Sequence, residues 1–242
     1  GHPYDNRFQP ACGNVIWKST PTVDYFSATH RAYRRAVDPE GMSHRCYVAA
    51  EDLIVRRTIL FIKNPGYFVI MDSVRYPDPE KPFTRAVSGW WHSPTPFKVC
   101  KTNSAVITGE TTGCLLLWMH PETIRRIDTG WDFDSSVECA GNRKSYSLRV
   151  RSWTTQTSLN INGLTTIIIP FHGKMPKITT ELINPPNGKF YRAEAIQINI
   201  NNRKDQIILN PEKINGFKVG DRKISCCAEI TLGNMTQPVR IQ

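Results

Sequence analysis

Hydrophobic and polar positions alternate over short runs along most of this chain after residue 44. The runs are rich in β-branched and aromatic residues and are separated by Gly, Pro, Asn and Asp, a pattern typical of strands joined by turns. The clearest two runs are 53–63 and 67–74, which Asn64-Pro65-Gly66 joins as a predicted hairpin. Further strands are predicted at 83–92, 97–101, 104–109, 114–120, 145–160, 164–170, 177–183, 189–201, 205–209 and 222–232.

So many short strands do not fit in one flat sheet, and we therefore predict an all-β fold, a two-layer antiparallel β-sandwich. Helical periodicity is weak throughout, and only 25–35 is predicted as a short helix or turn. Three prolines place 75–82 in a surface connection. We expect residues 1–242 to form a single sandwich domain, with 1–22 as an irregular lead-in.

The charge balance favours an acidic partner. Lys and Arg number 31 against 21 Asp and Glu, which gives a net charge of +10. Polyanionic sugars, nucleic acid and membrane surfaces all attract such a protein. The charges are dispersed rather than gathered on one phosphate-tracking face, and no stretch reaches the roughly 18 to 20 apolar residues of a membrane helix. We therefore expect neither a nucleic-acid nor a membrane partner.

The seven cysteines form no CxxC or CxxH pattern, which excludes zinc-ribbon and thioredoxin-like sites. Cys226 and Cys227 are adjacent, so in a strand their side chains would point to opposite faces. Buried free thiols and one or two disulfides are both compatible with this distribution.

One stretch concentrates cationic and aromatic residues: His30-Arg31-Ala32-Tyr33-Arg34-Arg35. Guanidinium groups bind carboxylates and sulfates through a bidentate fork, and a neighbouring aromatic ring can stack on a sugar. Arg31, Arg34 and Arg35 are therefore candidate ligands of an acidic sugar chain. The alternative is an exposed loop with solvated charges.

Two adjacent indoles, Trp90 and Trp91, end a predicted strand, so only one of them readily joins the core. Trp91 is a candidate sugar contact, with burial in the core as the alternative.

His120 and His172 lie at strand ends and are interpreted as loop histidines. Catalytic motifs such as GxSxG, HExxH or a glycine-rich phosphate loop do not occur, so spacing alone predicts no enzyme.

Several elements taken in order resemble the C-terminal β-sandwich domain of heparinase II/III-like polysaccharide lyases. They are Val23–Tyr33 with its Asp-Tyr and His-x-x-Tyr elements, the strand Arg56–Lys63, the strand Tyr67–Asp72, the stretch Trp90–Ser93, and Leu164–Pro170. The matching elements span about residues 23–230. Each element alone is weakly specific, whereas their ordered set is more specific.

The resemblance implies an α/α toroid domain upstream of the sandwich, and cleavage of uronate-containing glycans, such as glycosaminoglycans, by β-elimination. Tyr and His side chains carry out the proton transfers in this chemistry. In the family the catalytic Tyr lies on the toroid and a His comes from the sandwich; His30, Tyr33 and His44 are the candidates here. We expect the isolated chain to be inactive as a lyase and the protein to be periplasmic or secreted.

Some family members hold a structural zinc, and this sequence matches only part of that site. Asp72 and His92 stand at the second and third ligand positions, whereas Val55 replaces the first and Leu53 stands near the family's catalytic His. Two ligands do not complete a tetrahedral zinc site. We therefore expect no cofactor, and a structural hydrogen bond between Asp72 and His92.

A carbohydrate-binding module without chemistry is the alternative function. The two functions differ in the upstream sequence, where a lyase would encode on the order of 300 to 400 residues of helical repeats, beyond the size of one ordinary domain.

Overall fold

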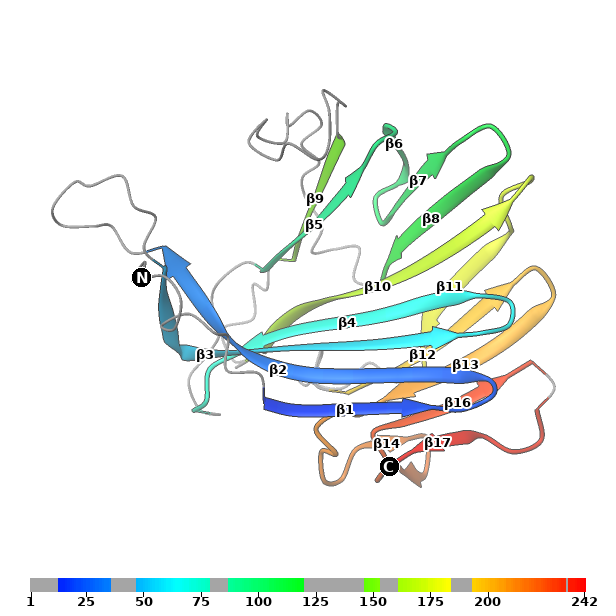
Figure 1. The fold of residues 1–242 in the computed structure, drawn as a ribbon. Helices are drawn as coiled ribbons and strands as arrows, with labels where there is room; N and C mark the ends of the chain where they lie inside the picture. The colour runs from blue at the N-terminus through cyan, green and yellow to red at the C-terminus, as the bar shows by residue number, and fades with distance from the viewer. Residues whose placement is uncertain are drawn as a thin grey trace, which may run out of the picture.

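The structure, a computed structural model, describes residues 13–35, 47–78, 87–119, 146–152, 161–183, 193–233 and 235–242. None of these residues lies in a helix, and their strands are arranged in two layers (Figure 1). The strands are β1 Gly13–Ser19, β2 Val23–Arg35, β3 Tyr47–Ile62, β4 Tyr67–Arg75, β5 Val87–Ser93, β6 Phe97–Lys101, β7 Ser104–Thr108, β8 Thr112–Trp118, β9 Tyr146–Ser152, β10 Ile161–His172, β11 Ile178–Leu182, β12 Glu194–Ile200, β13 Arg203–Leu209, β14 Lys218–Val219, β15 Arg222–Lys223, β16 Ala228–Leu232 and β17 Val239–Ile241.

Two antiparallel sheets make up most of the described fold, as the sequence predicts. One is eight-stranded, in the order β1-β2-β3-β4-β10-β8-β7-β6, and the other is five-stranded, in the order β11-β12-β13-β16-β17. Two short ladders, β5-β9 and β14-β15, complete the described strands. The predicted all-β sandwich is thus confirmed.

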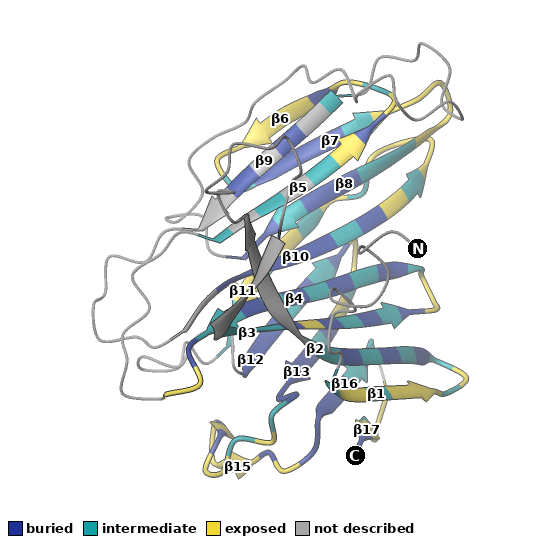
Figure 2. Cartoon of the chain, turned by 60° about the vertical axis from the view of Figure 1, so that its left-hand side comes forward, coloured by how far each residue is buried: buried dark blue, intermediate teal, exposed yellow. Residues whose placement is uncertain are grey.

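The main core lies between the two sheets. Residues of β4 alternate between buried and partly exposed, so that Tyr67, Val69 and Met71 face inward (Figure 2). From the second sheet, isoleucines of β12, β13 and β16 join the same cluster. Period-two alternation on both sheets therefore builds one apolar layer, and burial of apolar surface contributes about 25 cal/mol per Å².

The outer face of the eight-stranded sheet is covered unevenly. Over β7, β8 and β10, the β5-β9 ladder buries a second cluster that includes Leu116, Leu148 and Leu164. Over β3 and β4, the described residues leave an apolar surface, where Phe61 and Phe68 stack at 4.5 Å between ring centroids and both remain partly exposed. We call this surface the aromatic face; its described members are Trp17, Phe26, Ile59, Phe61, Phe68 and Ile70.

Hydrogen bonds between buried polar groups join the two sheets across the apolar core. The Tyr67 hydroxyl donates to Asp205 Oδ2 at 2.8 Å, and the Thr165 hydroxyl donates to Glu194 Oε2 at 2.7 Å. Both carboxylates are fully buried. Since an unpaired buried carboxylate is costly, these bonds favour this one alignment of the sheets.

Two sequence predictions about the N-terminal part are wrong. Residues 25–35 belong to strand β2 rather than to a helix or turn, and 13–19 of the predicted irregular lead-in form strand β1. The alternation in β2 was hidden because polar Ser27 faces the interior while apolar Phe26 faces outward. In β2 the burial of the side chains alternates with a period of two, whereas their polarity does not.

The predicted hairpin at Asn64-Pro65-Gly66 is confirmed, since Ile62 pairs with Tyr67 and Gly66 has a φ of 92° that suits glycine. The predicted strand 222–232 is instead divided into β15 and β16.

No helical stretch in the described ranges has the length and hydropathy needed to cross a membrane.

The described cysteines, Cys100, Cys114, Cys226 and Cys227, are free thiols. Cys227 joins the main core, whereas Cys226 packs in a third cluster on the other side of the second sheet, so the two point apart as predicted. Burial raises the pKa of both thiols, which makes them poor nucleophiles. The other three cysteines lie outside the described residues.

Candidate functional site

Strands β2 and β3 extend lengthwise beyond the ends of their neighbours β1 and β4 and form a two-stranded ribbon there. The pairing of β1 with β2 stops at Thr29, and the pairing of β4 with β3 stops at Ile54. From Ala32 onward, β2 pairs only with 47–50 of β3 in the described structure. We call residues 30–35 and 47–53 the basic arm; it leaves the sandwich at the end away from the β3–β4 turn (Figure 1).

The basic arm brings most of the predicted site residues into one short stretch. Their backbone partners on β3 are Val55 for His30, Ile54 for Arg31, Ala49 for Tyr33, Val48 for Arg34 and Tyr47 for Arg35, with a register shift between Arg31 and Ala32. His44 lies outside the described residues. This part of the predicted helix or turn is therefore a two-stranded ribbon, and the role of its arginines stays a prediction.

At the base of the basic arm, two further arginines serve the fold. Arg56 Nε lies 3.5 Å and Arg75 Nε 3.2 Å from Glu212 Oε1, and the Glu212 side chain is only 9% exposed. Arg56 also donates from Nη1 to Ser27 Oγ at 3.2 Å. Because these guanidinium groups neutralise a buried carboxylate, they are structural ion pairs rather than ligand-binding groups.

Arg57 and Asp72 form a cross-strand pair on the outer face of the sheet. Arg57 Nε donates to Asp72 Oδ1 at 2.7 Å and Nη2 donates to Oδ2 at 2.9 Å. Hydrogen bonding to Asp72 raises the pKa of Arg57. The expected hydrogen bond between Asp72 and His92 is not formed; among the described residues Asp72 pairs with Arg57 instead.

The described residues do not fit a zinc site. Both oxygens of Asp72 accept hydrogen bonds from Arg57, and Val55 supplies no ligand atom. His92 is exposed on β5, in the separate β5-β9 ladder. Within the described ranges, no three His, Cys, Asp or Glu residues are grouped so that they could hold a metal ion.

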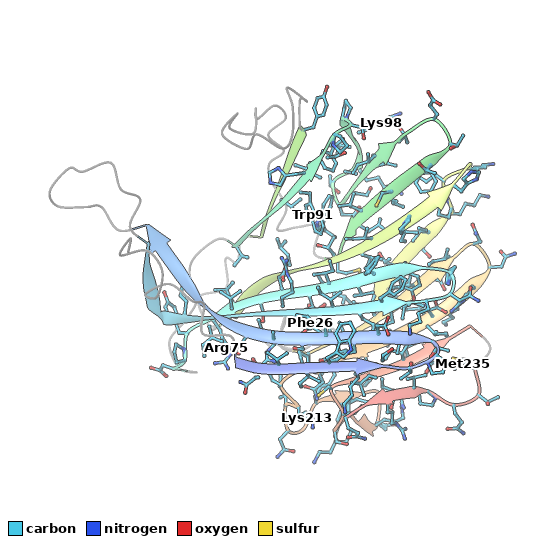
Figure 3. The ribbon with its side chains drawn as sticks, in the orientation of Figure 1. Phe26, Arg75, Trp91, Lys98, Lys213 and Met235 are labelled. Atoms are coloured by element: carbon cyan, nitrogen blue, oxygen red, sulfur yellow. The ribbon has the colours of Figure 1, made fainter. Side chains whose placement is uncertain are left out.

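Trp91 packs against the second cluster, which contains Leu148 and Leu164, and is partly exposed (Figure 3). Its Nε1 is buried and has no hydrogen-bond partner in the described part of the chain. The packing of this indole agrees with burial in the core, which was the alternative to a sugar contact in the sequence analysis. A sugar contact at Trp91 stays a prediction.

Sequence reasoning missed a pocket of about 810 Å³ at the opposite end of the sandwich. Its lining residues come from the ends of strands that are distant in sequence: Thr22, Asn64, Pro65, Ile200, Asn201, Asn202, Arg203, Lys204, Leu232, Gly233 and Met235. The consecutive asparagines 201 and 202 between isoleucine-rich strands do signal a turn. Nothing local shows which other turns meet it.

Comparison with solved structures shows a shared fold with heparan sulfate lyases. A mutant of heparan sulfate lyase HepC from Pedobacter heparinus superposes with a TM-score of 0.58 and 15% identity, over 81% of this chain and 27% of that chain. A heparinase III with methylated lysines gives a TM-score of 0.56 and 16% identity, over 81% of this chain and 26% of the lyase.

The chain thus spans about a quarter of the length of these lyases. No protein-family model matches the sequence, and neither does any curated protein. The identities are low, so the likeness establishes the fold and confirms the predicted resemblance at that level.

Proposed function

We propose that this chain is the β-sandwich domain of a heparinase II/III-like polysaccharide lyase. It would help to bind and cleave a uronate-containing anionic polysaccharide, such as a glycosaminoglycan, together with an α/α toroid domain outside these 242 residues. The observation that carries the proposal is the basic arm, which places Arg31, Arg34 and Arg35 on a ribbon extending from a lyase-like sandwich. We place the full protein in the periplasm or outside the cell.

The arm's residues would act on the uronate ring. In β-elimination a base removes the proton at C5, its electron pair forms a double bond between C4 and C5, and the bond from C4 to the glycosidic oxygen breaks as that oxygen takes a proton. Guanidinium groups beside the carboxylate stabilise the negative charge that develops. Arg31 together with Arg34 or Arg35 would do this, since adjacent strand residues point to opposite faces. His30, Tyr33 or His44 would carry out one of the two proton transfers with the substrate, and a group of the toroid would carry out the other.

The aromatic face supports a role as one domain of a larger protein. Trp17 is 64% exposed, and Phe26, Phe61 and Phe68 are partly exposed beside it. A contiguous apolar surface of this kind is a common site of domain contact. We propose that the toroid packs here, so hydrogen exchange at β2 to β4 should slow when the upstream domain is included. Equal exchange with and without that domain would contradict this placement.

The binding test compares two double variants with the same loss of charge. Arg34→Ala/Arg35→Ala removes two arm arginines, whereas Lys98→Ala/Lys101→Ala removes two exposed lysines of β6. We expect only the arginine variant to lose affinity for a uronate polymer, measured near physiological salt, where exposed charges are screened over about 8 Å. Equal losses would show that the arm is only a solvated surface.

The activity test follows the ultraviolet absorbance of the unsaturated uronate that β-elimination creates. We expect none from the isolated chain on heparan sulfate, hyaluronan, chondroitin or alginate, and a steady rise from the protein that includes the upstream domain. In that longer protein, His30→Ala, Tyr33→Phe and His44→Ala would identify the proton-transfer group. Activity of the isolated chain would contradict the proposal that catalysis needs groups from both the sandwich and the toroid.

A further inference from the structure

We propose that the pocket opposite the basic arm is a second binding site, which takes a short acidic oligosaccharide. We call it the end pocket. Strand β3 runs from the arm at Tyr47 to Ile62, beside the pocket residues Asn64 and Pro65. Nine residues of β3, from Ile54 to Ile62, lie between the arm and the β3–β4 turn, a separation on the order of 30 Å. The end pocket therefore lies outside the site of the proposed function, although its ligand class rests on that proposal.

One wall of the end pocket is held by a fully buried carboxylate. Asp205 accepts hydrogen bonds from Tyr67 Oη at 2.8 Å, from Arg203 Nε at 2.7 Å and from the Gly233 backbone N–H at 2.8 Å. These bonds attach the Arg203 side chain and the β16–β17 connection to the core. The wall is thus formed before any ligand binds, which lowers the entropy cost of binding.

The asparagine turn is fixed in a similar way. Asn201 has a φ of 55°, a left-handed conformation that asparagine tolerates. Its backbone N–H donates to the Lys177 carbonyl at 2.8 Å, and its Oδ1 accepts from the Lys177 N–H at 3.2 Å. This double contact fixes the β12–β13 turn. The next residue, Asn202, therefore lines the pocket from a fixed backbone position.

Several polar groups that line the end pocket have no hydrogen-bond or ion-pair partner in the described part of the chain. Arg203 uses Nε for Asp205, while its two Nη groups have no partner among the residues that the structure describes. The same holds for the side chains of Asn64, Asn202 and Lys204. The ammonium of Lys204 and two amides are therefore available to a ligand, together with the Nη groups of Arg203, whose charge is largely offset by the fully buried carboxylate of Asp205.

These groups suit an acidic sugar. Side-chain amides both donate and accept hydrogen bonds, as sugar hydroxyls require, and the free edge of a guanidinium suits a carboxylate or sulfate. Pro65, Leu232 and Met235 also line the pocket and offer apolar contact for the ring C–H groups. The lining has no aromatic side chain on which a nucleobase could stack. A volume of about 810 Å³ is within the usual range for ligand sites.

The test titrates the isotope-labelled chain with three tetrasaccharides: one of uronates, one sulfated and one neutral. We expect backbone amide shifts at 202–204 and Gly233 with an acidic tetrasaccharide and none with the neutral one. Shifts confined to the basic arm would overturn this inference and leave the proposed function standing. Shifts confined to the end pocket would support the inference and contradict the arm's role, and no shifts at either place would overturn both.

Matched charge reversals then test specificity. Lys204→Glu places a negative charge at the end pocket, and Lys98→Glu makes the same change on β6, far from it (Figure 3). We expect the first to raise the dissociation constant about tenfold and the second less than about twofold. Asn202→Ala, which removes no side-chain hydrogen bond among the described residues, should also weaken binding. Equal effects of the two lysine variants, with unchanged melting temperatures, would overturn the proposal.

Discussion

Tyr67 in β4 donates its hydroxyl hydrogen to Asp205 in β13 across the interior of the sandwich, at 2.8 Å. Both side chains are fully buried; Tyr67 belongs to the eight-stranded sheet and Asp205 to the five-stranded sheet. Asp205 also fixes Arg203, so one buried carboxylate supports both the alignment of the sheets and the wall of the end pocket. Stability and ligand binding are therefore linked at this residue.

Removing the Tyr67 hydroxyl should destabilise the protein. Tyr67→Phe leaves Asp205 short of one donor in a buried site, so we expect the free energy of unfolding in urea to fall by about 1–3 kcal/mol. Tyr25→Phe is the matched control, because the Tyr25 hydroxyl is also buried but has no hydrogen-bond partner in the described structure. Equal losses in both variants would show that the bond to Asp205 contributes nothing specific.

Stability should decline at alkaline pH because of the same tyrosines. Burial, the larger cause, raises the pKa of Tyr25 and Tyr67, and the nearby Asp205 carboxylate raises the Tyr67 pKa further. Above the unfolded pKa of about 10, the phenols ionise only in the unfolded chain, so unfolding becomes more favourable as the pH rises. Phenolate absorbance should therefore show a late component that appears only with unfolding. The Tyr25→Phe/Tyr67→Phe variant should lose this late component.

Glu229 should make the protein sensitive to acid. Its burial alone would raise the carboxyl pKa, but hydrogen bonds from Arg240 at 2.9 Å and Arg222 at 2.6 Å outweigh burial and lower it. The stability that follows is present above the unfolded pKa of about 4.3 and is lost as the pH falls through the lower folded value. Glu229→Gln should flatten the dependence of melting temperature on pH in this window. An unchanged slope would rule out this contribution.

The sequence predicted the strands wherever apolar alternation was strong and turn residues marked the ends. The β3–β4 hairpin is one example, since Pro65 and Gly66 lie between two long β-branched runs. Where inward positions are polar, as Ser27 is in β2, the period of two was hidden and the prediction failed. Local pattern therefore predicts an element best when side-chain polarity and burial agree.

The candidate site was predictable only in part, for the same physical reason. The basic arm appeared as a cluster because its residues are consecutive. The end pocket joins turns that are more than a hundred residues apart, and Glu212 reaches Arg56 and Arg75 through tertiary packing alone. No local pattern distinguishes an arginine held by a buried glutamate from one free to bind a ligand.

The adjacent arginines 56 and 57 should therefore respond very differently to removal. Arg56 is 8% exposed and pairs with the buried Glu212, whereas the Arg57 side chain is 56% exposed. Arg56→Ala removes one of the guanidinium groups that neutralise Glu212, and we expect a loss of about 3 kcal/mol in the free energy of unfolding. Arg57→Ala should cost only about 0.2–1 kcal/mol, since water screens its pair with Asp72. Urea denaturation of both variants measures the contrast, and a larger loss at Arg57 would contradict the assignment of Arg56 as the structural arginine at the base of the arm.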